Sequence, residues 1–581
     1  MSSSKDIIKD DVVSSSDTPY QSNQSDTTPK QSIGSSFINS FKRLEFDESL
    51  LTPDMTEAEK IEVRLAHTPL QRSLKQRHLQ MISIGSSVGT GLFVGSGSAL
   101  RTGGAASLPI AWSIVGTFLF AVIHALGELA VTYPTPGAFS AYATKFIDPS
   151  WGFAMGWNYV FLWLVVLPLE VIAASLTIQF WNESINPVAW VVIFYVLIMT
   201  INLFGVKGYG EAEFIFSLIK VVAIIGFLIL GIVLVCGGGP SGGFVGGKYY
   251  HDPGAFTHGF KGFCSVLVVA SYALGGSELI GVTAAETKNP RKSLPSAIKQ
   301  VFWRLMLFYL GGLTLVSLLV KATDKRLLSS SSADASASPF VIAIKNGGIK
   351  GLPSVMNVVI LISVLSVGNS AVYGCSRTLT SLAAQGLAPS IFGYIDRMGR
   401  PIFGIALNGI SGLLCFIVAN RKIQNEVFTW LLAICGLCII FTWLTISICH
   451  VRFRLAMKAQ GRSLRDLAFT SHAGFWGSVY AIVLMILVLI AQFWISLFPI
   501  GGQPNARAFF ENYIGFPVFF ALYFGRKLWT RKFWEFTPLN QINLDSGRKD
   551  VDTDLLRQEL DEEKEYIKSR PFWYRTYRFW C

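Results

Sequence analysis

The sequence predicts an all-α integral membrane protein with twelve transmembrane helices, on three observations. Of its 581 residues, 51% are hydrophobic and only 15% are charged, with a mean hydropathy of +0.46. Soluble domains carry about 25% charged residues, so this composition favours the membrane class. The apolar residues are gathered into runs of about 20, the length that crosses the bilayer core. Polar residues are concentrated at the two ends of the chain and between these runs.

The two ends of the chain read as tails around a membrane core. Residues 1–75 are rich in Ser, Thr, Asp and Lys and contain few aromatic residues, which predicts a disordered N-terminal tail. This stretch lacks the basic-then-apolar layout of a signal peptide. Residues 76–528 form the predicted twelve-helix core, and residues 529–581 form a C-terminal tail.

The predicted spans follow the apolar runs, and the fourth and ninth are the shortest. They lie at about 79–99, 107–133, 153–179, 188–204, 212–236, 260–283, 300–321, 351–374, 402–419, 427–449, 475–498 and 509–528. An even number of spans places both tails on one side of the membrane. Lys and Arg are about twice as frequent on that side, which makes both tails cytoplasmic.

This distribution of basic residues also explains the net charge of +12 without a nucleic-acid partner. Asn182-Glu183-Ser184 forms an outward-facing sequon, but it lies too close to the membrane for glycosylation to be a strong expectation. Seven of the eight cysteines fall in or beside apolar runs, without metal-ligand spacing, so we expect buried thiols, no disulfide framework and no metal. These are Cys236, Cys264, Cys375, Cys415, Cys435, Cys438 and Cys449.

Two of the predicted spans contain glycine-rich interruptions. GSSVGTG at 85–91 interrupts the first span, and ALGGSE at 273–278 interrupts the sixth. Each glycine within a helix costs about 1 kcal/mol relative to alanine. Broken helices at corresponding positions of two halves are a pointer to a transporter's binding site near the bilayer midplane. The pattern predicts two inverted five-helix repeats, at about 79–236 and 260–449, with accessory helices at about 475–528.

The chemistry of such a break suits a zwitterion. The second half-helix presents free N–H groups and a positive dipole end to a carboxylate. The carbonyl groups that end the first half-helix suit an ammonium group. A free amino acid is therefore the expected ligand class. The alternative interpretation is a small-residue packing stripe, because Gly85/Gly89 and Gly91/Gly95 have small-xxx-small spacing.

Ionisable residues inside predicted spans are candidates for function because each costs about 3 kcal/mol or more at mid-bilayer. Lys220 lies in the otherwise apolar run FIFSLIKVVAIIGFLILGIVLV, about 12 Å into the fifth span. A lysine at that depth could gain and lose a proton during transport, in place of a bound sodium ion. The alternative is a permanently charged lysine whose ammonium group is satisfied by backbone carbonyls.

The acidic candidates are Glu278, directly after the second break, Glu170 in the third span and Glu128 in the second. Glu278 could orient the unwound segment or carry protons, and structural hydrogen bonding is the alternative for all three. His124 is expected to be a satisfied interior histidine, and Glu286 to pair with a nearby Lys or Arg.

Enzymatic signatures are missing from the sequence: it has no H-E-x-x-H motif, no Walker loop and no nucleophile elbow. The glycine-rich stretch 236–256 lacks the GxxxxGK[ST] spacing of a phosphate-binding loop. We therefore expect neither enzymatic activity nor a cofactor.

Long blocks of the chain resemble the fungal amino-acid permeases of the amino acid–polyamine–organocation superfamily, over about residues 65–581. The tail ending in WYRTYRFWC looks most like the general amino-acid permease branch. The blocks are RHLQMISIGSSVGTGLFVGSGSALRTGG, GELAVTYPTPGAFSAYATKFIDPSWGFAMGWNY, NLFGVKGYGEAEFIFSLIKVV, GGSELIGVTAAETKNPRKSLPSAIKQVFWR and VLSVGNSAVYGCSRTLTSLAAQGLAPSIFGYIDRMGRP.

The resemblance implies a LeuT-like fold with alternating access around broken helices 1 and 6. It implies that the substrate carboxylate meets Ser86, Ser87, Gly89, Thr90 and Gly91. The amino group would meet carbonyls near Ser87, Tyr272 and Gly275, with Ser277 also at the site and Tyr272 as an aromatic gate. Lys220, Glu278 and Glu170 are the proton-coupling candidates. Lys220 is expected near the carbonyl of Gly85 and near Asn369 and Ser370. Ser86-Ser87 stands where many relatives carry Gly-Thr or Gly-Ala, which leaves selectivity open.

The tails suggest regulation. The resemblance implies ubiquitination at Lys5 and Lys9 by ubiquitin-ligase machinery, with endosomal trafficking, although a solvated lysine without a role is the alternative. Residues 551–568 could form an amphipathic helix. The resemblance suggests palmitoylation of Cys581, which follows Phe579 and Trp580. A prenylation box does not fit, because its Cys would stand four residues from the end.

The sequence thus predicts a plasma-membrane amino acid/proton symporter of broad specificity, with amino acid, proton and membrane lipid as partners. Two alternatives stay open. One is a permease of narrower specificity, for example for basic amino acids. The other is an amino-acid-sensing receptor with a transporter fold.

Overall fold

The computed structural model describes residues 39–44, 48–55, 57–66, 70, 73–181, 184–287, 290–328, 338–419, 424–548, 558, 562 and 565–574. The chain divides into two units, residues 1–42 and 43–581, of which the second holds all elements discussed below. Lys5, Lys9, Cys581, Asn182-Glu183 and most of 551–568 lie outside the described residues.

The regular elements of the described part are helices, accompanied only by two isolated bridges, Arg43 to Asp396 and Leu74 to Thr287. The first half of the core contains α3 (Gln76–Gly85), η2 (Gly91–Gly95), α4 (Ser96–Gly103), α5 (Ser107–Thr132), α6 (Ala138–Phe146), α7 (Pro149–Ile178), α8 (Pro187–Leu203) and α9 (Gly205–Val235).

The second half contains α10 (Gly259–Leu274), α11 (Leu279–Thr283), η4 (Ala284–Glu286), α12 (Pro290–Arg304), η5 (Leu305–Gly311), α13 (Gly312–Leu319), α14 (Lys325–Leu328), α15 (Pro339–Asn346), α16 (Leu352–Ala384), η7 (Ser390–Gly393), α17 (Ile402–Gly412), η8 (Leu413–Ala419) and α18 (Gln424–Ala459). The last helices are α19 (Gly474–Leu497), α20 (Ala506–Tyr513) and α21 (Gly515–Thr530). The remaining short elements are η1 (Glu48–Leu50), α2 (Glu57–Ala66), η3 (Tyr250–Gly254), η9 (Leu464–Asp466) and η10 (Leu539–Gln541).

Eight helical segments of the described chain are long and apolar enough to cross a membrane. Each of them coincides with one of the twelve predicted spans. The other four predicted ranges hold helices that are interrupted or short: α3 with η2 and α4, α8, α17 with η8, and α20 with α21. The protein is therefore an all-helical, multi-pass membrane protein, and the full set of twelve spans stays a prediction.

Several helices are longer than predicted. The start of α9 is Gly205 rather than 212, and α16 continues to Ala384 and α18 to Ala459. A helix of 31 to 36 residues is about 45–55 Å long at 1.5 Å per residue, which exceeds the bilayer core of about 30 Å. Hydropathy detects only the apolar part of such a helix, so polar residues in the extensions were not assigned to it.

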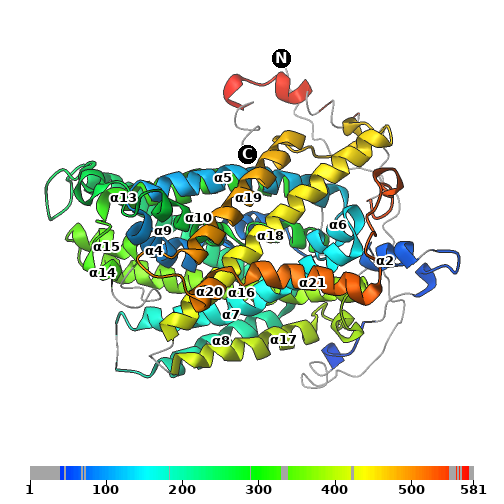
Figure 1. Ribbon diagram of the computed structural model, residues 1–581, viewed down its shortest axis with the longest axis horizontal. Helices are drawn as coiled ribbons and strands as arrows, with labels where there is room; N and C mark the ends of the chain where they lie inside the picture. The colour runs from blue at the N-terminus through cyan, green and yellow to red at the C-terminus, as the bar shows by residue number, and fades with distance from the viewer. Residues whose placement is uncertain are drawn as a thin grey trace, which may run out of the picture. The chain divides into compact units, whose positions relative to one another are not determined.

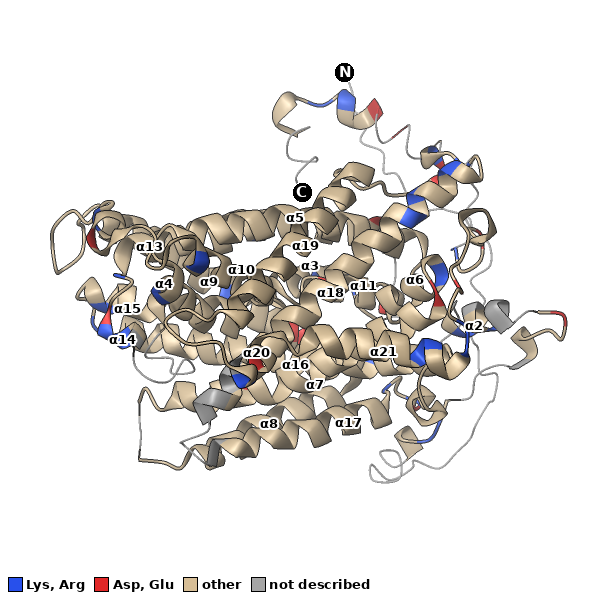
Figure 2. Ribbon diagram, viewed as in Figure 1, with Lys and Arg blue, Asp and Glu red and all other residues tan. Residues whose placement is uncertain are grey.

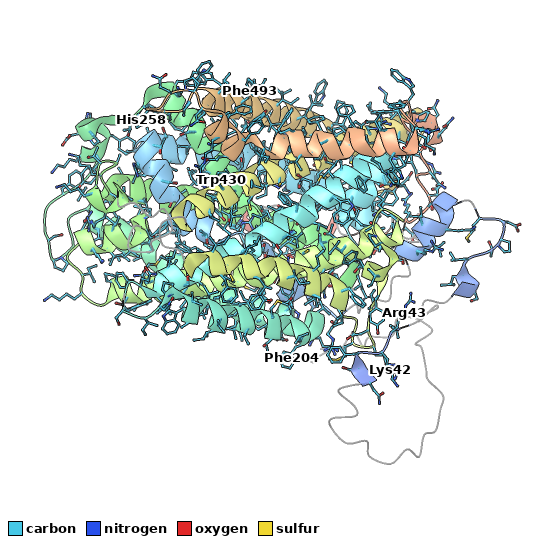
Figure 3. All side chains as sticks on the ribbon, turned by 60° about the horizontal axis from the view of Figure 1, so that its bottom comes forward. Lys42, Arg43, Phe204, His258, Trp430 and Phe493 are labelled. Atoms are coloured by element: carbon cyan, nitrogen blue, oxygen red, sulfur yellow. The ribbon has the colours of Figure 1, made fainter. Side chains whose placement is uncertain are left out.

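The helices differ in how much apolar surface they bury. In the most apolar 18-residue stretch of α7, 83% of the residues are buried, whereas in the corresponding stretch of α9 only 28% are buried. The outward face of α9 carries residues such as Val222 and Ile229, both more than 60% exposed. Because water-soluble proteins rarely expose so much aliphatic surface, these faces are suited to lipid. Figure 3 likewise shows Phe204 and Phe493 at the outer surface of the helices.

The helices α7 and α16 make the most extensive contact in the helix bundle. They pack against one another, and α7 also contacts α8, α17, α18 and α21. Figure 1 shows α7, α8 and α17 side by side. In Figure 2 the charged residues gather toward the helix ends, and the middle of the bundle is mostly uncharged.

The cysteines follow the expectation with one exception. Six of the seven cysteines in the described part are buried free thiols, but Cys236 is exposed. It caps the C-terminal end of α9, where the helix emerges from its neighbours. The expectation that all seven would be buried is wrong at this position.

Candidate functional site

The first glycine-rich stretch breaks its helix where the sequence predicts. The helix α3 ends at Gly85, residues 86–89 are not helical, and the chain resumes as the π-helical turn η2 from Gly91. Gly91 is packed so closely that a Cβ atom would lie 2.4 Å from the Cα atom of Ala273. The glycine therefore allows the first break to approach the end of α10.

The second stretch also breaks its helix. The helix α10 ends at Leu274, Gly275 is extended, and Gly276 has a φ of +88° before α11 begins at Leu279. Glycine adopts this left-handed conformation without steric cost. The hydroxyl group of Ser86 donates a hydrogen bond to the carbonyl of Gly276 at 3.0 Å. The two breaks, which are 190 residues apart in sequence, thus lie against one another.

Two side chains that follow the second break tie both breaks together. The hydroxyl group of Tyr309 lies 2.9 Å from the carbonyl oxygen of Ser87 and 2.9 Å from that of Ala273. The buried guanidinium of Arg304 donates to the carbonyl of Ser83 and, at 2.5 Å, to the hydroxyl of Ser277. These groups satisfy backbone carbonyls near both breaks, and unpaired carbonyls inside a membrane are costly.

A cavity lies between the breaks and α7. Of the eight residues predicted to bind substrate, seven line it: Ser86, Ser87, Gly89, Thr90, Gly91, Tyr272 and Gly275. The eighth, Ser277, is outside the lining, because its hydroxyl donates to the carbonyl of Leu274 and accepts from Arg304. The rest of the lining is Leu162, Trp163, Val166, Glu170, Gly276, Val367 and Ile439.

The cavity is narrow in this conformation, with a volume of about 20 Å³. A cavity needs about 10–15 Å³ to hold one water molecule. Its walls must therefore move apart to admit a larger ligand. Val367 and Ile439 are apolar wall residues on α16 and α18, whereas the two breaks supply most of the polar wall.

Glu170 is the acidic residue of the cavity wall. It is buried, and its carboxylate accepts hydrogen bonds from the hydroxyl of Thr90 in the first break and from that of Tyr272 at 2.9 Å. One carboxylate on α7 thus contacts residues next to both breaks. The predicted gate residue, Tyr272, is held in the wall by this bond.

Lys220 lies outside the cavity lining and behind the first break. Its ammonium group donates to the carbonyl of Gly85 at 2.7 Å, as expected, and to the hydroxyl of Ser366 at 2.8 Å. The eighth predicted span was expected to approach Lys220, and within it the contact is made by Ser366. Asn369 instead accepts a bond from Asn202, and the hydroxyl of Ser370 pairs with that of Tyr209. Ser366 lies about one turn earlier on α16.

The close contact between Lys220 and the first break depends on Gly85. A Cβ atom at this residue would lie 1.7 Å from the hydroxyl oxygen of Ser217 on α9. With a larger residue, the end of α3 could not lie near enough to α9 for Lys220 to reach its carbonyl.

The carboxylate of Glu278 is held by hydrogen bonds from other groups of the protein. Its carboxylate accepts hydrogen bonds from the backbone N–H of Gly276 at 3.2 Å, the indole of Trp443 at 3.1 Å and the hydroxyl of Tyr159 at 3.3 Å. It does not line the cavity. These contacts agree with the first of its two expected roles, which is to orient the unwound segment.

The other ionisable residues singled out in the sequence, Glu286, Glu128 and His124, pair away from the cavity. Glu286 forms an ion pair with Arg377 at 3.2 Å, which confirms the expected pairing. Glu128 lies 2.5 Å from the guanidinium of Arg454. His124 bonds to a backbone carbonyl within its own helix. Each contact is a structural pairing of the kind expected as the alternative to function.

Sequence reasoning missed three buried polar residues beside the site: Glu213, Arg304 and Tyr309. Glu213 and Arg304 lie near the predicted starts of the fifth and seventh spans, where charged residues are usually loop residues. A signal for Glu213 was available, because it precedes Lys220 by seven positions. Residues seven apart lie on the same face of a helix.

Comparisons with known proteins agree with this architecture. A sequence model described as "Amino acid permease" matches residues 78–538. The general amino-acid permease GAP2 of Candida albicans is 57% identical over 557 residues, which cover 96% of this chain and 95% of the relative. The general amino-acid permease GAP1 of Saccharomyces cerevisiae is 54% identical, covering 96% and 93%. The tryptophan permease of Saccharomyces cerevisiae is 53% identical, covering 88% and 87%.

Proposed function

The chain belongs to the amino acid permease family, and on this premise we propose that it imports a broad range of L-amino acids together with protons across the plasma membrane. As a member of this family it is a membrane transporter of amino acids and not an enzyme. Family membership does not establish proton coupling, broad specificity or location in the plasma membrane; these three properties are our proposal.

One arrangement supports this proposal above all others: the two helix breaks lie against one another and line the same cavity. The start of a half-helix attracts a carboxylate, and the carbonyl end of the other attracts an ammonium group. Groups common to all amino acids would thus be bound by backbone and by small hydroxyl side chains such as Ser87 and Thr90.

Broad specificity is supported by the aliphatic residues in the remaining wall of the cavity. Leu162, Val166, Val367 and Ile439 are apolar and carry no group that would select one substrate side chain by hydrogen bonding. Apolar pockets discriminate weakly among side chains of similar size. Glu170 supports the alternative of a permease for basic amino acids, because its carboxylate could pair with a cationic side chain.

The twelve-span fold with two inverted repeats is supported by matching lengths in the two halves. The broken pair α3 and α4 corresponds to the broken pair α10 and α11. The long helices α7 and α16 correspond with 30 and 33 residues, and α9 and α18 with 31 and 36. Between them, α8 and α17 are both short. Alternating access would then move one group of helices against the other around the breaks.

Proton coupling is supported by the contacts of Lys220. In its charged form the ammonium group holds the carbonyl of Gly85 at the start of the first break. Loss of a proton would weaken this bond and release the end of α3. Protonation of Lys220 would in this way bias the conformation of the substrate site, and no sodium ion would be needed.

We also propose that both tails are cytoplasmic and carry regulatory modifications. Lys5 and Lys9 would be ubiquitinated by a ubiquitin ligase before endosomal trafficking, and Cys581 would be palmitoylated. Mass spectrometry of the full chain after purification from its membrane tests each modification. Their absence under both nutrient-rich and nutrient-poor growth would contradict this part of the proposal.

The decisive experiment is uptake of labelled amino acids into proteoliposomes, with proton and sodium gradients imposed separately. We expect a proton gradient to drive accumulation of small apolar, polar and basic amino acids alike, and Lys220→Met to abolish gradient-driven accumulation. Uptake of basic amino acids alone would favour the narrower permease. Sodium-driven uptake that ignores pH would contradict the role of Lys220. Binding without uptake under either gradient would favour a receptor.

A further inference from the structure

We propose that Glu213 is the proton acceptor of Lys220, with the hydroxyl group of Ser366 as the relay between them. This inference rests on the proposed proton coupling and names the group that receives the proton on the cytoplasmic side. Glu213 lies on α9, two turns before Lys220, and the start of α9 is cytoplasmic in the proposed topology.

The three groups form a hydrogen-bonded chain with a defined direction. The ammonium group of Lys220 donates to the hydroxyl oxygen of Ser366 at 2.8 Å. That hydroxyl donates to the carboxylate of Glu213, at 2.6 Å from one oxygen and 2.8 Å from the other. The direct distance between Lys220 and Glu213 is 3.9 Å, which is too long for a hydrogen bond. The serine hydroxyl is therefore the connecting group.

The chain is enclosed by the protein. Glu213, Lys220 and Ser366 are all at most 1% exposed. An ion pair in such surroundings is costly unless further hydrogen bonds satisfy it. The carbonyl of Gly85 on α3 and the hydroxyl of Ser217 on α9, 3.4 Å from Glu213, supply such bonds. If the proton moves to Glu213, both Glu213 and Lys220 are neutral. The site can therefore hold either the ion pair or the neutral pair.

Two further titratable groups lie beside the hydrogen-bonded chain, one on a neighbouring helix and one on α9 itself. Glu170 on α7 interacts with Lys220 electrostatically from the side of the substrate cavity. Tyr209, one turn before Glu213, has its hydroxyl 3.1 Å from that of Ser370 on α16 and its ring stacked on Tyr373. Lys220 thus lies between a carboxylate on the cavity side and a carboxylate on the cytoplasmic side.

The transfer step conserves all atoms and charge. An N–H bond of the Lys220 ammonium group breaks, and its proton binds the hydroxyl oxygen of Ser366. The proton originally on that oxygen moves to a carboxylate oxygen of Glu213. Lys220 is then a neutral amine, Glu213 is a neutral acid, and Ser366 is unchanged. The bond between Lys220 and the carbonyl of Gly85 is weakened, which connects proton release to the first break.

The test compares the wild-type chain with Glu213→Gln and Ser366→Ala in proteoliposomes, using labelled L-alanine and L-leucine. Two readouts are needed: accumulation driven by an inward proton gradient, and exchange of internal for external amino acid without a gradient. Glu211→Gln is the matched control, because Glu211 lies on the same helix but is half exposed and pairs with Arg77.

We expect proton-driven accumulation to fall at least tenfold in Glu213→Gln and in Ser366→Ala, while exchange remains measurable. Glu211→Gln should behave as the wild-type chain. Accumulation at the wild-type level in either Glu213→Gln or Ser366→Ala overturns the inference. So does loss of exchange together with accumulation in both variants, since that indicates a structural role.

Two further results separate this inference from the function on which it rests. If Glu213→Gln does not yield folded protein, Ser366→Ala decides the outcome, because it retains both charged groups and removes only the relay. If the wild-type chain exchanges amino acids but shows no proton-driven accumulation, the proposed symport itself fails. A wild-type chain that is proton-coupled, with unchanged coupling in the variants, overturns the role of Glu213 alone.

Discussion

The hydroxyl group of Tyr309 lies 2.9 Å from the carbonyl oxygen of Ser87, in the middle of the first helix break. The same hydroxyl lies 2.9 Å from the carbonyl of Ala273 at the end of α10. A single phenol group thus connects the two unwound segments that form the cavity. This contact holds the two broken helices in one geometry.

Replacement of Tyr309 by Phe should weaken amino-acid binding by about five- to tenfold, because a hydrogen bond contributes about 0.5–1.5 kcal/mol and the single phenol proton that two carbonyls share is lost. Binding to the purified protein measures the change. Tyr142→Phe is the matched control, since its buried hydroxyl donates to the carbonyl of Tyr133 outside the site. It should lower thermal stability and leave the dissociation constant unchanged. Equal effects of both variants on binding would contradict the bridging role.

Replacement of Gly91 by Ala should abolish most uptake. The added Cβ atom would lie 2.4 Å from the Cα atom of Ala273, and a backbone atom cannot turn aside as a side chain can. Gly95→Ala is the control within the same π-helical turn, because the nearest atom there is a methyl group of Val269 at 3.4 Å. We expect at least a tenfold loss of uptake for Gly91→Ala and little change for Gly95→Ala. Normal uptake by Gly91→Ala would show that the breaks need not touch.

Replacement of Glu170 by Gln should reduce uptake by about 10- to 100-fold, since hydrogen bonds to charged groups contribute about 1.5–3 kcal/mol. The amide keeps the shape of the side chain but cannot accept from both Thr90 and Tyr272 as the carboxylate does. Tyr272→Phe removes one donor and should have a smaller effect. Uptake kinetics at several substrate concentrations measure both variants. A larger loss in Tyr272→Phe would mean that the aromatic gate, and not the carboxylate, dominates.

The described part of the C-terminal tail should contribute to the stability of the core. The side chains of Ile542 and Leu544 are at most 5% exposed, and the hydroxyl of Tyr133 donates to the carbonyl of Leu544 at 2.7 Å. Burial of one such aliphatic side chain contributes about 1.5–3 kcal/mol. A chain truncated after residue 536 should therefore unfold at a lower temperature than one truncated after residue 548. If both truncated chains have the same thermal unfolding midpoint in detergent, residues 537–548 do not stabilise the core.

Much of the architecture was predictable because membrane burial leaves a strong pattern in a sequence. Long apolar runs located eight spans that the structure also contains. Glycine clusters located both breaks, since glycine is the residue that tolerates an unwound segment and close backbone contact. The resemblance to the amino-acid permeases implied eight substrate residues around these breaks, and seven of them line one cavity.

The polar residues at the helix ends were less predictable. Hydropathy places Glu213 and Arg304 at the edges of spans, where a charged side chain usually faces water. Whether such a residue is buried depends on the neighbouring helices. Ser366 carries no distinguishing signal among the many serines of the chain, and only the packing of α16 against α9 makes it a partner of Lys220.

The sequence by itself determined the class of protein, the apolar segments and the positions of both helix breaks, because these depend on composition and on backbone freedom within a few residues. The tertiary structure decided which groups meet. It brought Ser86 and Gly276 together across 190 positions, placed Ser277 outside the cavity lining, and made Ser366 the residue of α16 that contacts Lys220. Contacts between distant helices depend on how their faces pack in three dimensions, and spacing along one chain does not contain that information.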